Sequence, residues 1–158
     1  MLSVNLRHLE NRNLSLRGEL SVSELDLDTR DEMIRVTQPV RYDFEIERLN
    51  DALLIQGKLQ ATLDCECVRC LKKFERELEL NSWTLHLPLE GEDAVAVDND
   101  CVDLTPFVRE DILLEFPQHP LCKPDCGGLK KIETGKVPKT TGKRKVSPAW
   151  AELNKLKL

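Results

Sequence analysis

Three runs of alternating apolar and polar residues dominate the first 90 positions, at residues 34–46, 52–63 and 74–89. Side chains on a strand point to opposite faces in turn, so each run predicts a strand with one buried face. Pro39 favours an edge strand or a bulge within the first run, and residues 48–51 supply a turn before the second. The apolar parity changes between Leu80 and Trp83, which predicts a bulge near residues 81–82. Together the runs predict an antiparallel sheet with one buried face.

One helix is expected after an acidic, poorly patterned loop at residues 91–100. Thr105 is suited to the N-cap, with Pro106 at the first helical position. Pro117 then ends the helix. The apolar positions between them recur on one helical face, at Val108, Ile112, Leu113 and Phe116. We expect this stripe to pack on the sheet.

The predicted fold class is therefore α+β, a single β-rich antiparallel domain over residues 1–129 with one main packed helix. Residues 130–147 hold many lysines and few apolar side chains, a composition that predicts a mobile basic linker. Ser147 and Pro148 favour the start of a short C-terminal helix over residues 148–158. Because so short a helix is marginal alone, its stripe should dock on its own domain or on a partner. The stripe consists of Trp150, Leu153 and Leu156.

The composition argues against a membrane protein or a secreted protein. Of the 158 residues, 41% are hydrophobic and 32% charged, and no run approaches the ~20 apolar residues that cross a bilayer. The first residues lack the basic and apolar pattern of a signal peptide. We therefore expect a cytoplasmic protein without membrane contact.

The net charge of −5 hides an asymmetry along the chain. Residues 1–129 hold 14 basic and 26 acidic side chains, whereas residues 130–158 hold nine basic and two acidic ones. A basic tail on an acidic body is typical of a tail that contacts a polyanion or docks on its own domain. A solvated linker is the alternative. The candidate phosphate-binding residues are Lys130, Lys131, Lys136, Lys139, Lys143, Arg144 and Lys145.

Six cysteines without a secretory signal favour metal or redox chemistry over disulfides. Cys67 and Cys70 form a C-x-x-C pair between two predicted strands, and Cys122 and Cys126 form a C-x3-C pair followed by two glycines. Two close pairs on turns suit a structural zinc ion with four thiolate ligands. The predicted fold thus includes two loops, one with each cysteine pair, that a zinc ion holds together.

The other candidate ligands have simpler interpretations. Cys65 is expected to be a small apolar side chain on the sheet, and Cys101 is also assigned to packing. His119 lies three residues before the second pair and is an alternative ligand, although a solvent-facing loop histidine is the simpler interpretation.

Four motifs occur in order: CVRCL at residues 67–71, DLTPFVREDILLEFP at 103–117, HPLCKPDCGGL at 119–129 and PAWAELNKL at 148–156. This combination resembles the YceD family, a bacterial and plastid family linked to accumulation of large-subunit ribosomal RNA. The resemblance places the family's cysteine pairs on the four cysteines named above. Many members carry another cysteine shortly after the GL, where this chain has Lys130 and Lys131.

The resemblance implies a non-enzymatic factor for synthesis, processing or stability of large-subunit ribosomal RNA and for assembly of the large subunit. Its partner is then this RNA or a pre-ribosomal particle, with a ribosomal protein as a further candidate. Two alternatives stay open: a thiol redox protein or metallochaperone that uses the CVRC pair, and an acidic adaptor for a basic ribosomal protein. The histidines (His8, His86 and His119) are scattered, so we expect neither catalysis nor a small-molecule substrate.

Overall fold

The computed structural model describes residues 1–28 and 31–129. Strands and helices follow one another in the order β1 (Ser3–Asn5), the 3-10 helix η1 (Leu6–Leu9), β2 (Leu14–Leu20), β3 (Ile34–Val36), β4 (Val40–Arg48), β5 (Ala52–Glu66), β6 (Lys73–Pro88), β7 (Cys101–Asp103) and α1 (Thr105–Leu114). The predicted architecture, an antiparallel sheet with one α-helix, is confirmed for this part of the chain.

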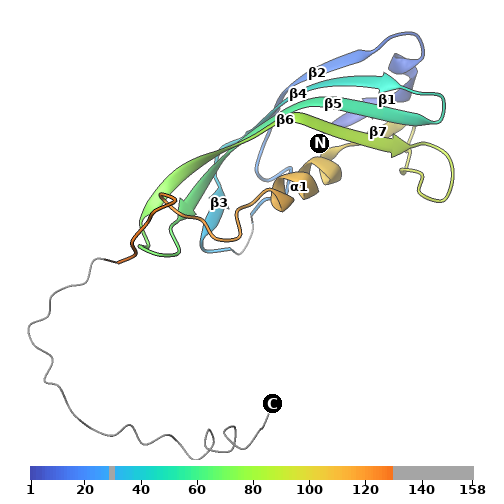
Figure 1. Ribbon diagram of the computed structural model, residues 1–158. Helices are drawn as coiled ribbons and strands as arrows, with labels where there is room; N and C mark the ends of the chain where they lie inside the picture. The colour runs from blue at the N-terminus through green and yellow to red at the C-terminus, as the bar shows by residue number, and fades with distance from the viewer. Residues whose placement is uncertain (29–30, 130–158) are drawn as a thin grey trace, which may run out of the picture.

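The main sheet is built around β5, and all its pairs are antiparallel. Along one edge β5 pairs first with β4 and then with β3, and along the other it pairs with β6 over nearly its whole length. Strand β2 lies outside β4. The β5–β6 hairpin, with strands of 15 and 16 residues, is a twisted ribbon that runs the length of the molecule (Figure 1).

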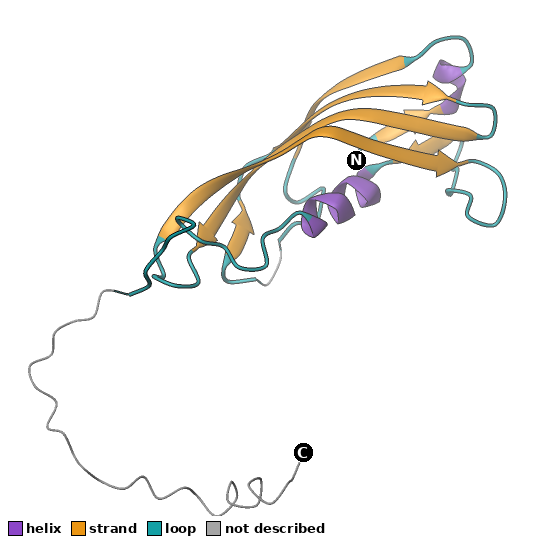
Figure 2. Cartoon of the chain, viewed as in Figure 1, coloured by secondary structure: helices purple, strands orange, loops and turns teal. Residues whose placement is uncertain are grey.

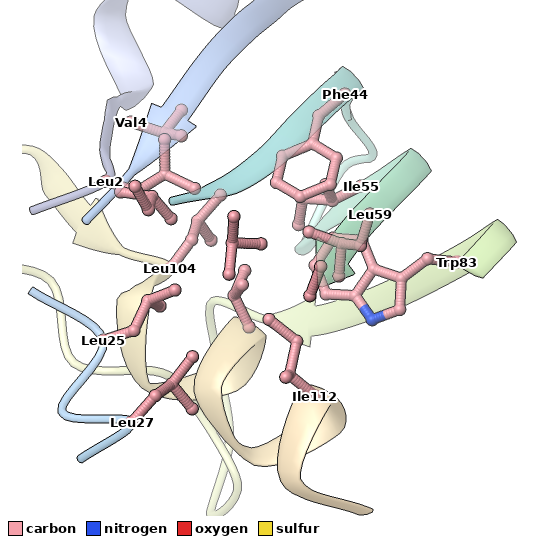
Figure 3. Packing of buried hydrophobic residues seen from close by; sticks show 14 of the residues in the cluster. Leu2, Val4, Leu25, Leu27, Phe44, Ile55, Leu59, Trp83, Leu104 and Ile112 are labelled. Carbon is pink, nitrogen blue, oxygen red and sulfur yellow. The ribbon is translucent and has the colours of Figure 1, made fainter. Parts of the chain in front are cut away.

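A second layer covers one face of this sheet. It consists of α1 and the small β1–β7 sheet (Figure 2). Between the layers, Ile112 of α1 meets apolar side chains of the main sheet (Figure 3). Val108 of α1 belongs to the same buried cluster. Leu113 packs at the margin of this core, so the predicted stripe faces the sheet along the helix. Phe116 also packs there, but α1 ends at Leu114, before Phe116 and Pro117, so the expected helix end was wrong.

Two irregularities of the sheet follow the sequence pattern. The chain leaves the sheet between β3 and β4, next to Pro39, so the run at 34–46 forms two strands rather than one. In the hairpin, Gly57 pairs with Trp83 but Leu59 pairs with Leu80. One residue of β5 therefore faces two of β6, and the predicted bulge at 81–82 is confirmed.

Other expectations need correction. Thr105 is the first helical residue and not the N-cap: Leu104 is the cap, and the Thr105 hydroxyl accepts a hydrogen bond from the Leu2 amide at 2.9 Å. The Asp103 carboxylate accepts instead from the Thr105 amide, at 2.9 Å. The predicted strand at 52–63 extends to Glu66. The predicted linker at 130–147 and helix at 148–158 lie outside the described residues.

Candidate metal centre

The first cysteine pair lies in the turn of the β5–β6 hairpin. Here the Cys67 amide donates to the Lys72 carbonyl at 2.9 Å, and the Leu71 amide donates to the Cys67 carbonyl at 2.8 Å. Leu71 has a φ of 59°, a left-handed conformation that lets the chain reverse direction tightly. We call residues 67–72 the knuckle.

The second pair lies in residues 119–129, here called the cysteine loop. This loop follows α1 and runs beside the knuckle at one end of the molecule (Figure 1). The Val68 amide donates to the Pro120 carbonyl at 3.0 Å, and the Arg69 guanidinium donates to the Cys126 carbonyl at 3.0 Å. Within the loop, the Cys126 amide donates to the Lys123 carbonyl at 3.1 Å. Backbone and side-chain bonds thus hold the two segments in register.

Together these segments bring four cysteine sulfurs into one cluster. The Sγ atoms of Cys67, Cys70, Cys122 and Cys126 all lie within 4.8 Å of one another. The Cys67 and Cys126 sulfurs are 3.7 Å apart, and those of Cys70 and Cys122 are 3.6 Å apart. Tetrahedral zinc with Zn–S bonds of about 2.3 Å places its sulfurs about 3.8 Å apart. The cluster therefore has the ligand type, number and spacing that fit such an ion, and it could hold a metal.

The protein environment shifts the pKa values of Cys67 and Cys122 in opposite directions. Burial raises the pKa of Cys67, but hydrogen bonds from the amides of Cys122, Cys70 and Arg69 stabilise its thiolate and bring the pKa down to about 6. The pKa of Cys122 is raised to about 12, chiefly by its hydrogen bond with the Cys70 thiol and also by burial and the other two sulfurs. Four crowded thiolates repel one another, and a cation among them would relieve this repulsion.

The remaining candidate ligands lie apart from the cluster. Cys65 is buried on the sheet at 3% exposure, as predicted. Cys101 lies in β7 and is only partly buried. His119 is exposed and does not belong to the cluster. All six cysteines are free.

Sequence reasoning missed Arg69 as a residue of this site. Its guanidinium bridges the two segments, although 57 residues separate it from Cys126. The only sequence signal is its position inside the C-x-x-C motif. The candidate phosphate-binding residues from Lys130 to Lys145 and the stripe of Trp150, Leu153 and Leu156 lie outside the described residues. Within residues 1–28 and 31–129, no helix is long and apolar enough to span a membrane.

The chain is similar to one protein family and to several proteins of known sequence. The family model "Large ribosomal RNA subunit accumulation protein YceD" matches residues 55–157, which include the knuckle, α1 and the cysteine loop. Similar curated proteins include "Uncharacterized protein Rv2926c" of Mycobacterium tuberculosis, 27% identical over 135 residues, and "Uncharacterized protein YlbN" of Bacillus subtilis, 26% identical over 132 residues.

The alignments cover these relatives unequally. They include 77% of this chain and 65% of Rv2926c, and 78% of this chain and 77% of YlbN. The chain thus spans about two thirds of the length of its mycobacterial relative. No solved structure matches the chain.

Proposed function

We propose that this chain, which belongs to the YceD family, acts without catalysis to support the accumulation of large-subunit ribosomal RNA and the assembly of the large subunit. The observation that carries the proposal is the family match over residues 55–157. It spans the cysteine cluster and most of the basic segment. The proposed site of action is the cytoplasm.

Charge supports direct contact with a pre-ribosomal particle. Residues 130–158 carry nine basic and two acidic side chains. Lysine and arginine in a segment without many aromatic residues contact RNA phosphates without reading sequence. We therefore assign phosphate contacts to the basic residues between Lys130 and Lys145.

Zinc is the metal that best suits the cysteine cluster. Four thiolates with tetrahedral spacing form a closed structural site, and such a site leaves no position for substrate or water. Its role is to fasten the cysteine loop to the end of the β5–β6 hairpin. This arrangement also supports a non-enzymatic role, because the four sulfurs serve the metal.

The thiol redox alternative has weaker support. A redox C-x-x-C pair gains its reactive thiolate at the N-terminus of a helix, but Cys67 and Cys70 lie in a hairpin turn between β5 and β6. Both also pack against the second cysteine pair.

The adaptor alternative has one specific observation in its favour. Glu45, Glu77 and Glu79 are exposed on strands β4 and β6. They lie on the face of the sheet opposite α1, as the strand alternation requires. This face suits a basic ribosomal protein.

Sucrose-gradient sedimentation of the tagged chain from cell lysate tests the proposal. We expect co-migration with large-subunit precursors at low salt and progressive loss as salt rises, because phosphate contacts are screened. A chain found only at the top of the gradient under both conditions contradicts direct binding. Co-migration that requires one ribosomal protein, and not RNA, selects the adaptor alternative.

A further inference from the structure

We propose that the cysteine end of the folded domain is a second RNA-contacting surface, whose lysines bind phosphates. We call this surface the cysteine tip and define it as residues 67–73 and 119–129. The inference rests on the proposed function, because it takes the RNA of the large-subunit precursor as partner. It goes beyond that function by assigning a contact to the folded domain and by coupling the contact to the metal.

Charge distinguishes the tip from the rest of the domain. Its sequence holds four basic residues and one acidic residue, whereas the other positions up to 129 hold 10 basic and 25 acidic ones. A zinc tetrathiolate adds two negative charges, which still leaves the tip about one positive charge against about 15 negative charges elsewhere. A polyanion is therefore repelled by most of the domain and approaches this end.

Two lysines are free to make the contact. Lys72 and Lys123 are exposed, and neither forms an ion pair within the described part of the chain. The other two cations are less available: Arg69 is bonded to the Cys126 carbonyl, and Lys73 lies opposite Glu66 in the hairpin. Lys72 and Lys123 are thus the residues we assign to phosphate binding.

The metal cluster determines how these lysines are presented. Lys72 comes from the knuckle and Lys123 from the cysteine loop, and the four cysteines bring those segments together. The end of the cysteine loop also lies at the knuckle, because a Cβ on Gly128 would be 3.6 Å from the Arg69 carbonyl oxygen. In the sequence, Lys130 and the basic segment follow Leu129 directly.

The side chains of the tip indicate the kind of contact. Its exposed apolar residues are aliphatic, namely Val68, Leu71 and Leu129. The tip contains no Phe, Tyr or Trp on which bases could stack. We therefore expect sequence-independent, salt-sensitive phosphate contacts. An acidic protein is the competing partner, and the experiment separates the two.

Fluorescence anisotropy of the zinc-loaded full chain with a fluorescein-labelled RNA hairpin of mixed sequence tests the proposal between about 50 and 200 mM salt. The double variant Lys72→Glu/Lys123→Glu should bind RNA more than about tenfold more weakly. The slope of log affinity against log salt concentration should become shallower by about one to two. The matched control Arg48→Glu/Lys58→Glu has the same charge change on exposed positions outside the tip. It should lose less than about threefold.

Metal removal provides a second readout. Chelation should weaken RNA binding by the wild type and the control, but should change little in the tip variant, whose tip contact is already lost. If zinc content shows that the double variant has lost the centre, Lys72→Gln/Lys123→Gln replaces it, with an intermediate loss expected.

Three results would overturn the inference. Equal losses of RNA affinity in the tip and control variants, or an RNA affinity that neither the tip variants nor chelation changes, would show that the tip does not bind RNA. Displacement of the RNA by poly-glutamate at equal charge concentration would identify an acidic protein as the partner. If the tip variants still bind RNA normally while the protein sediments with precursors, the tip inference fails and the proposed function stands. If the chain never sediments with precursors, the proposed function itself fails.

Discussion

The Sγ atoms of Cys67 and Cys126 lie 3.7 Å apart, although 59 positions separate them in the sequence. Cys67 directly follows β5, and Cys126 lies in the cysteine loop after α1. The contact therefore ties the last described segment to the turn of the long hairpin. The four clustered sulfurs have the spacing of a tetrahedral thiolate site, so this contact belongs to a cluster that could hold a metal ion.

Metal removal should release the cysteine loop. Structural zinc contributes on the order of 10–16 kcal/mol of apparent binding free energy, comparable to the stability of a small domain. We expect native mass spectrometry to find one zinc ion per chain, and chelation to expose the loop to proteases. Cys67→Ser should lose the ion, whereas Cys101→Ser should keep it. Unchanged proteolysis after chelation would contradict the metal centre.

Arg69 should strengthen metal binding without touching the metal. Its guanidinium donates to the Cys126 carbonyl at 3.0 Å and orients that ligand. Loss of such an outer contact typically lowers metal affinity by about 10- to 100-fold. We expect this loss in Arg69→Ala, measured by competition with a chromophoric chelator. Arg76→Ala removes an exposed arginine on β6 and is the control. Equal affinities in both variants would show that the bridge is dispensable.

Gly57 is required by the close approach of β4 and β5. A Cβ at this position would lie 2.0 Å from the Asp43 carbonyl oxygen. Gly57→Ala should therefore separate the strands and cost at least about 2–3 kcal/mol of unfolding free energy. Gly127→Ala is the control, because a Cβ there has no atom within 4 Å. Urea denaturation of both variants measures the difference, and a stable Gly57→Ala would be inconsistent with the described register.

Trp83 joins the bulge of β6 to α1. Its indole N–H donates to the Asp111 carboxylate at 2.6 Å, and its ring lies 4.6 Å from that of Phe44. Trp83→Phe keeps an aromatic ring but leaves the carboxylate without its donor, so we expect a loss of about 1–3 kcal/mol. Asp111→Asn keeps an acceptor and should lose less. A larger loss in Asp111→Asn than in Trp83→Phe, in thermal or urea unfolding, would contradict this account and assign the stability to the charge of the carboxylate.

The sequence predicted those parts of the fold that produce a regular pattern. Alternation revealed the long strands, and the parity change before Trp83 located the bulge because one extra residue reverses every later side chain. Strands β1 and β7, of three residues each, are too short to alternate visibly. The segment LSLRGEL of β2 does alternate, and that signal was available.

The site was predictable to a similar degree. The spacing of the cysteines was enough to predict that the two pairs form one site. The hydrogen bond from Arg69 to Cys126 depends on a tertiary contact that no local sequence pattern indicates. The predicted N-cap was wrong because a Thr–Pro pair fits two placements equally well. It can occupy the N-cap and the first helical position, or the first and second helical positions. The contact between the Thr105 hydroxyl and the Leu2 amide decided between them.

The most direct test of the account measures the ratio of large- to small-subunit ribosomal RNA in cells that lack this chain. We expect the ratio to fall, and to recover with the wild-type chain and with Cys101→Ser. Cys67→Ser and Lys72→Glu/Lys123→Glu should restore it only in part, because they disturb the metal centre and the cysteine tip. An unchanged ratio without the chain would contradict a role in large-subunit RNA accumulation.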